Sequence, residues 1–150
     1  MTEELRLKLC DIQGRLFELS AQNGYPSAPF IKAFMNSKTA KYLDSPYNRM
    51  QWAGEEYLLD EIISANPDIL SANGEIFSVD IMYWIGYIYR YWSFYTGESS
   101  SKIFKQAPTS AMKRNYMMFH TMDSSLAIDD LKEIYNQRHN KQSKNTADRK

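Results

Sequence analysis

The hydrophobic pattern is densest between Ser78 and Tyr95, SVDIMYWIGYIYRYWSFY, where large apolar or aromatic residues cover nearly every direction of a helix. A helix that is apolar all round is normally buried. One narrow strip differs, because it carries the smallest side chains and the only cation of the stretch. Its members are Val79, Tyr83, Gly86, Arg90 and Ser93. The stretch is therefore predicted to be a buried central helix, with a neighbouring backbone close to that strip.

Both ends of this central helix carry clear signals. Ser78 is a good N-cap, Asp80 places a negative charge near the positive end of the helix dipole, and Gly97 suits a left-handed stop. A membrane-spanning helix is the alternative, since the apolar stretch has about the twenty residues that a bilayer needs. However, Asp80 and Arg90 each oppose insertion by roughly 2.5–3.5 kcal/mol near the bilayer centre. We expect no membrane span.

Apolar stripes with helical spacing predict further helices on both sides. Those before the central helix are Thr2–Gln22, a short helix after Ser27, one or two turns within 37–43, and a helix from Ser45-Pro46 to Ala65. Those after it are one or two turns within 101–106, a helix from Pro108-Thr109 and a last helix from Asp123-Ser124. No segment alternates convincingly with a period of two. The predicted fold is all-α, a single compact bundle of five to seven helices.

Two packing expectations follow from the connections and the composition of this bundle. Because the connection at 68–77 is short, the helix ending at Ala65 is expected to pack antiparallel on the central helix. The methionines near the C-terminal end are interpreted as core filling. They are Met112, Met117, Met118 and Met122.

Length and composition indicate one domain, 1–138, followed by a disordered basic tail, 139–150. The last eleven residues, NKQSKNTADRK, contain no apolar side chain larger than Ala, which favours disorder. The chain has 150 residues, zero formal net charge and 14% aromatic residues, including eleven Tyr. Buried Tyr needs partners for its hydroxyl group.

A single cysteine, Cys10, excludes an internal disulfide framework, and the first residues lack a secretory signal, so a cytoplasmic location is expected.

Arg90 is the most informative charged residue, because it sits on a very apolar helix. Such a cation either pairs with an acid inside the bundle or anchors a partner protein at the surface. We favour the internal pair, with Glu55 or Glu56 as the nearest candidate acids. Adjacent helical residues diverge by about 100°, so Glu55 and Glu56 cannot both point into one pocket, and a solvated face is the simpler interpretation.

The sequence shows no catalytic constellation. His120, within YMMFHTMD, is a candidate general base, but no nucleophile or acid stands beside it at a recognisable spacing, which favours a structural role. With two His and one Cys, we predict no metal site and no cofactor. TGESSSK at 96–102 lacks the glycine spacing of a phosphate loop, so a helix stop followed by a cap is favoured over anion binding. The candidates for partner binding or a pocket are Glu55, Glu56, Tyr83, Tyr87, Arg90 and His120.

Four segments resemble a poorly characterised group of small bacterial proteins. They are RMQWAGEEY at Arg49–Tyr57, YWIGYIYRYW at Tyr83–Trp92, TGESS at Thr96–Ser100 and FHTMD at Phe119–Asp123. That group is associated with accessory genes beside toxin–antitoxin loci, some of which encode ADP-ribosyltransferase-like toxins. The resemblance covers roughly Ser27 to Arg138 and carries no catalytic assignment. It implies a bacterial cytoplasmic protein that binds another protein, such as a toxin encoded nearby.

Three classes of function remain open. A non-enzymatic protein-binding module, such as an antitoxin or immunity-type protein that masks its partner, fits the excess of Tyr and Trp. The acidic stretch 55–98 also suits a basic cleft on a toxin. A DNA-binding autoregulator is supported by the basic tail, whereas the neutral charge and the lack of a helix-turn-helix pattern oppose it. The third class is an enzyme or small-ligand receptor with a pocket of Tyr, Trp, Arg90, His120 and Glu55.

Overall fold

The computed structural model describes residues 1–45 and 52–148, with side chains as far as Asn140. Within those ranges the chain forms eight α-helices and the 3-10 helix Pro67–Ser71 and contains no strand, which confirms the all-α class. The number of α-helices is higher than the predicted five to seven, because the short segments around 37–43 and 101–106 both form complete helices. None of the described helices is long and apolar enough to cross a membrane.

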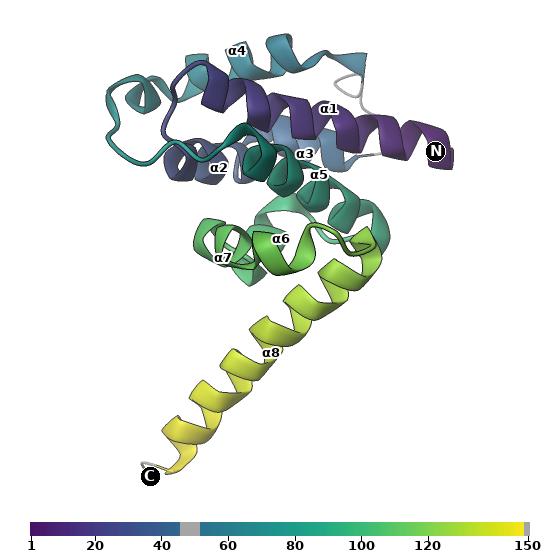
Figure 1. Ribbon diagram of the computed structural model, residues 1–150, viewed down its shortest axis with the longest axis vertical. Helices are drawn as coiled ribbons and strands as arrows, with labels where there is room; N and C mark the ends of the chain where they lie inside the picture. Colours follow the sequence, from purple (N-terminus) through teal and green to yellow (C-terminus); the bar gives the residue numbers. More distant parts are fainter. Residues whose placement is uncertain (46–51, 149–150) are drawn as a thin grey trace.

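The helices form a layered body from which the last one projects (Figure 1). In chain order they are α1 (Glu3–Gln22), α2 (Ser27–Met35), α3 (Lys38–Asp44), α4 (Glu55–Ala65), the 3-10 helix η2 (Pro67–Ser71), α5 (Val79–Thr96), α6 (Ser100–Gln106), α7 (Thr109–Phe119) and α8 (Ser124–Asp148). α1 lies between α4 and α5, and α6 and α7 cover the other side of α5 (Figure 1). α5 therefore occupies the centre, as predicted.

The predicted helix ends are confirmed where side chains cap the backbone. Thr2 accepts a hydrogen bond from the amide of Leu5, and Ser78 accepts one from the amide of Ile81. Gly97 ends α5 with a φ of 78°, in the left-handed region that glycine adopts without strain. These local signals mark the start of α1 and both ends of α5.

The start and packing of α4 differ from the prediction. The helix begins at Glu55, with Gly54 as its N-cap, and not at Ser45-Pro46. Residues 46–51 of the predicted helix lie outside the described residues. α4 packs on α1 rather than on α5. The expected antiparallel pairing of α4 with the central helix is wrong, because α1 already covers the small-residue strip of α5.

α1 and α5 cross at very short range through two glycines. A Cβ atom added to Gly86 would lie 2.5 Å from the carbonyl oxygen of Gln13, and one added to Gly14 would lie 2.8 Å from the ring of Tyr83. The side-chain amide of Gln13 donates a hydrogen bond of 3.0 Å to the carbonyl oxygen of Gly86. The close backbone approach predicted along the strip is thus confirmed.

Arg90 is buried in the same contact, with 1% of its surface exposed. Its Nε donates to Gln13 Oε1 at 2.8 Å, Nη1 to Asp44 Oδ1 at 2.6 Å, and Nη2 to Ser100 Oγ at 3.2 Å. The internal ion pair is confirmed, but the acid is Asp44 and not Glu55 or Glu56. Those two glutamates sit on α4, and α1 separates α4 from α5.

Asp44 joins α3 to two other helices. Besides pairing with Arg90, its carboxylate accepts hydrogen bonds from the backbone amide of Ser100 at 2.9 Å and from the Ser100 hydroxyl at 2.7 Å. The hydrogen bond from the Ser100 backbone amide satisfies one free N–H donor in the first turn of α6. A buried guanidinium is tolerated only when its charge and its donors are compensated, and here α1, α3, α5 and α6 each supply part of the network.

Glu98, between α5 and α6, attaches α8 to the body. Its carboxylate accepts hydrogen bonds from Lys132 Nζ at 2.6 Å, Trp92 Nε1 at 3.0 Å and Gln106 Nε2 at 2.6 Å. Burial by itself would raise the pKa of Glu98, but these hydrogen bonds outweigh it and lower that pKa from 4.5 to about 2. The carboxylate is therefore ionised throughout the physiological range.

The last helix, α8, extends past residue 138, where the predicted domain ends. The buried residues of α8, Ala127, Ile128 and Leu131, all lie in its first turns. Beyond them α8 continues to Asp148 and extends away from the body (Figure 1). The disordered basic tail expected from residue 139 stays a prediction, although the helix α8 runs as far as Asp148. That segment contains neither Gly nor Pro, so nothing in it breaks a helix that packing has already started.

Replacing Gly86 with Ala should lower the free energy of unfolding by about 2–3 kcal/mol, because the new methyl group would push α1 away from α5. Urea unfolding provides the measurement. Gly54→Ala is the matched control, since a Cβ atom there meets nothing within 4 Å. Its expected effect is below about 1 kcal/mol, from a weaker N-cap. Equal losses for the two variants would contradict the close crossing.

The depressed pKa of Glu98 predicts a specific acid sensitivity. Its folded pKa lies below its ordinary value of 4.5, so its stabilising contribution is complete above pH 4.5 and is lost as the pH falls towards about 2. Unfolding free energies measured across that window should fall more steeply for the parent than for Glu98→Gln. Glu133→Gln removes an exposed carboxylate of α8 and should follow the parent. Parallel curves for the parent and Glu98→Gln would exclude this role of Glu98.

Candidate functional site

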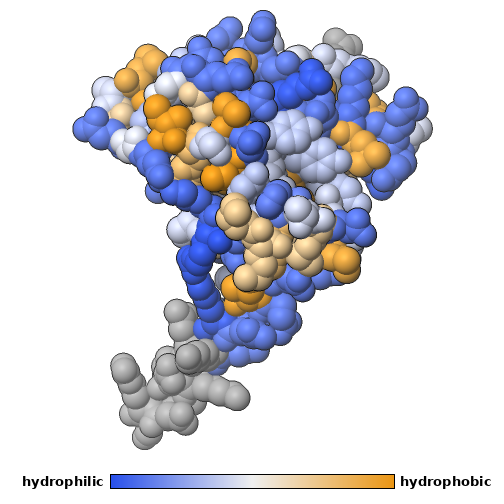
Figure 2. All heavy atoms as spheres, in the orientation of Figure 1, coloured by the Kyte–Doolittle hydropathy of each residue, from blue (hydrophilic) through white to orange (hydrophobic). Residues whose placement is uncertain are grey.

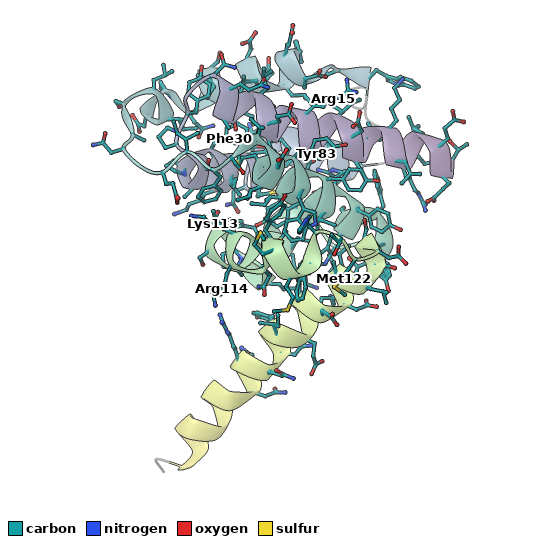
Figure 3. All side chains as sticks on the ribbon, in the orientation of Figure 1. Arg15, Phe30, Tyr83, Lys113, Arg114 and Met122 are labelled. Atoms are coloured by element: carbon teal, nitrogen blue, oxygen red, sulfur yellow. The ribbon has the colours of Figure 1, made fainter. Side chains whose placement is uncertain are left out.

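An open groove of about 550 Å³ lies between α5 and the turn that joins α7 to α8. We call it the aromatic groove. It is lined by Glu18, Asp80, Tyr83, Trp84, Tyr87, Ile88, Tyr116, His120, Met122 and Ser124. Figure 3 shows Tyr83 on α5 and Met122 at the turn, on the two sides of this region. Three residues singled out from the sequence, Tyr83, Tyr87 and His120, therefore meet in one place.

One wall is a row of tyrosines along α5. Tyr83 and Tyr87 are four residues apart, and their ring centroids lie 6.0 Å from each other. Tyr91 continues the row at 6.4 Å from Tyr87. The hydroxyl group of Tyr83 donates a short hydrogen bond to Asp11 Oδ1 of α1. Burial and this bond raise the pKa of Tyr83 well above its usual value, so the ring stays neutral and is held in one orientation.

The opposite wall is a stack of rings on α7. Tyr116 meets the ring of Trp84 edge-on at 5.7 Å and stacks on the ring of His120 at 4.4 Å. His120 Nδ1 lies 2.8 Å from the carbonyl oxygen of Tyr116, so the neutral ring carries its proton on Nδ1. This contact fixes the imidazole on its own helix, which agrees with the structural role expected for His120.

The groove shows none of the arrangements that activate a catalytic group. Among the described residues, the hydrogen bond of His120 goes to the Tyr116 carbonyl and not to a carboxylate or a nucleophile. Burial raises the pKa of the Cys10 thiol to about 12, so it is protonated at neutral pH. No group of three His, Cys, Asp or Glu that suits a metal ion occurs in the described part of the chain. The contacts that the described groove residues make are ring stacking and hydrogen bonds.

The other sequence candidates lie elsewhere. Arg90 is buried in the network with Asp44 and is not a surface anchor. Glu55 and Glu56 form the first turn of α4, and neither lines the groove. A wider depression of about 1110 Å³ between α2, α3 and α4 has one aromatic side chain in its lining, Tyr42. The aromatic groove is therefore the better candidate site.

Beside the groove, α7 and the start of α8 expose hydrophobic side chains, and two of them are methionines that were expected in the core. Met117 and Met118 are 77% and 71% exposed, and Leu126 at the start of α8 is 52% exposed. Figure 2 shows hydrophobic atoms over α7, next to the paler area over α5. Met112 alone of the four methionines is fully buried. The interpretation of the cluster as core filling is wrong for Met117 and Met118, because a short amphipathic helix leaves the choice of inner face ambiguous.

No protein-family model, curated protein or solved structure matches this chain. The candidate function therefore rests on the chemistry of the groove and its surroundings.

Proposed function

We propose that this chain is a non-enzymatic protein-binding module whose recognition surface is the aromatic groove together with Met117 and Met118. The observation that carries the proposal is a groove lined by Tyr and Trp rings, one wall of which belongs to the helix that exposes Met117 and Met118. Protein interfaces are enriched in these residue types, and they depend on a few aromatic anchors for most of their binding energy. Exposed methionine adapts to the shape of a partner because its side chain is flexible.

The rigidity of the rings supports a recognition role. The hydrogen bond to Asp11 holds Tyr83 in place, and His120 stacks on Tyr116 within one helix. A side chain that is already fixed in the free protein loses little conformational entropy on binding. The walls of the groove are thus preorganised, whereas the exposed Met117 and Met118 on α7 are adaptable, which favours a folded partner or a segment of one.

The resemblance to proteins encoded beside toxin–antitoxin loci narrows the kind of partner. In this proposal the chain masks a toxin or a related effector, as an antitoxin or immunity-type protein does. Masking requires a stable surface rather than catalysis, and a partner larger than the groove would also contact the exposed faces of α7 and α8. The absence of a catalytic arrangement around His120 in the described residues is compatible with this role.

Small-ligand binding is the second candidate. The volume of about 550 Å³ falls within the range of roughly 300–1,000 Å³ that is typical of ligand pockets. The two functions differ in what copurifies with the chain. Native mass spectrometry of the protein isolated from its host would show a stoichiometric small-molecule adduct for a receptor and a protein complex for a binding module.

Site-specific photo-crosslinking tests the proposal directly. A benzoylphenylalanine residue at position 87 should form a covalent adduct with one host protein. The same residue in place of Tyr57, which is 53% exposed on α4, should not form that adduct. In a binding assay with the crosslinked protein, Tyr87→Ala should cost roughly 2 kcal/mol or more of affinity, and Tyr57→Ala less than about 0.5 kcal/mol. Identical adducts from both positions, or equal effects of the two alanines, would exclude the groove as the recognition surface.

A further inference from the structure

The aromatic groove carries acidic groups that have no ion-pair partner. Glu18 lines it from α1, and Asp80 lines it from the first turn of α5. Neither carboxylate belongs to an ion pair in the described part of the chain. The one basic residue type in the lining is histidine, at His120. The groove therefore combines aromatic walls with two carboxylates that have no ion-pair partner among the described residues.

The bases of α7 do not neutralise this charge. Lys113 pairs with Glu75 at 2.5 Å and lies over the ring of Phe77 at 4.8 Å. Lys113 and Arg114 lie towards one end of α7, and Met122 lies beyond the other end (Figure 3). Lys113 is therefore engaged with Glu75, while Asp80 is exposed and Glu18 is partly exposed, so a partner can reach both carboxylates.

We infer that the groove binds a basic segment of the partner protein, with an arginine or lysine side chain held between its aromatic rings and the carboxylates of Glu18 and Asp80. This inference rests on the proposed function and adds the chemical class of the bound segment. A cation over an aromatic face is stabilised by the ring quadrupole, and more strongly when it is partly removed from water. Guanidinium groups suit such a site best, because they stack on rings and bind carboxylates through the same planar group.

The chain's own basic end is not the occupant in the same molecule. α8 begins at the groove with Ser124 and extends 25 residues to Asp148, away from the body (Figure 1). At about 1.5 Å per residue, its far end lies roughly 36 Å from the groove. The basic segment must therefore come from another molecule, and the charge of the groove favours a different protein that presents arginine to it.

Two matched peptides test the inference. The first is a fluorescein-labelled helical peptide of Ala, Leu and Arg, and in the second citrulline replaces each Arg, which keeps the shape and removes the charge. Fluorescence polarisation with the full chain at physiological ionic strength should give binding of the arginine peptide that is about tenfold tighter. Equal binding of the two peptides, or no binding of the arginine peptide up to millimolar protein, would overturn the inference.

Matched protein variants locate the effect. Glu18→Gln with Asp80→Asn should weaken binding of the arginine peptide about tenfold, whereas Glu61→Gln with Asp68→Asn should change it less than about twofold. Both variants lose two negative charges, and Glu61 and Asp68 are exposed at a different surface. Equal weakening by the two variants would indicate general charge attraction and would overturn the inference.

Binding of the host partner found by crosslinking distinguishes the groove as a recognition surface from the basic segment as its occupant. If Tyr87→Ala weakens that partner and Glu18→Gln with Asp80→Asn does not, the groove is the recognition surface but the basic segment is wrong. If neither variant affects the partner, the proposed function fails as well. Self-association that disappears in a chain ending at Asn140 would make a second copy the occupant and would overturn the assignment to a different protein.

Discussion

The buried charge of Arg90 is the constraint on which the arrangement of the helices depends. A guanidinium removed from water is stable only when a carboxylate and further acceptors surround it. Gln13 on α1, Asp44 at the end of α3 and Ser100 at the start of α6 meet that need together. The same Gln13 also donates to the Gly86 carbonyl, so the network and the close crossing of α1 with α5 reinforce each other.

This frame also positions the candidate site. Tyr83, Trp84 and Tyr87 lie one to two turns before Arg90 on α5, so fixing that helix fixes one wall of the groove. The other wall comes from α7 and from the turn into α8. Since Glu98 binds Lys132 of α8 and Gln106 of α6, it links that wall to the same body. The polar contacts of Arg90 and Glu98 thus connect both walls of the groove to the same body.

Features that depend on local sequence patterns were predicted correctly, whereas contacts between residues far apart in the sequence were missed. The length of α5, its glycine stop and its close-approach strip all follow from periodicity and capping. The partner of Arg90 lies 46 residues away at the end of a short helix, and nothing near Asp44 in the sequence indicates that pairing. Tyr83, Tyr87 and His120 were recognised as candidates, but the contribution of Glu18 and Met122 depends on how α1 and the α7–α8 turn pack. Those contacts are tertiary, so a single sequence does not reveal them.

A double-mutant cycle between Arg90 and Asp44 tests the central claim most directly. Arg90→Met and Asp44→Asn should each lower the unfolding free energy by about 3–5 kcal/mol, because each leaves the other charge buried without its partner. The double variant should lose about 2 kcal/mol less than the sum of the single losses. The control cycle of Arg90→Met with Glu55→Gln should be additive within about 0.5 kcal/mol. If the losses caused by Arg90→Met and Asp44→Asn were additive in the double variant, the central role of this ion pair would be contradicted, because the buried pair would not hold the helices together.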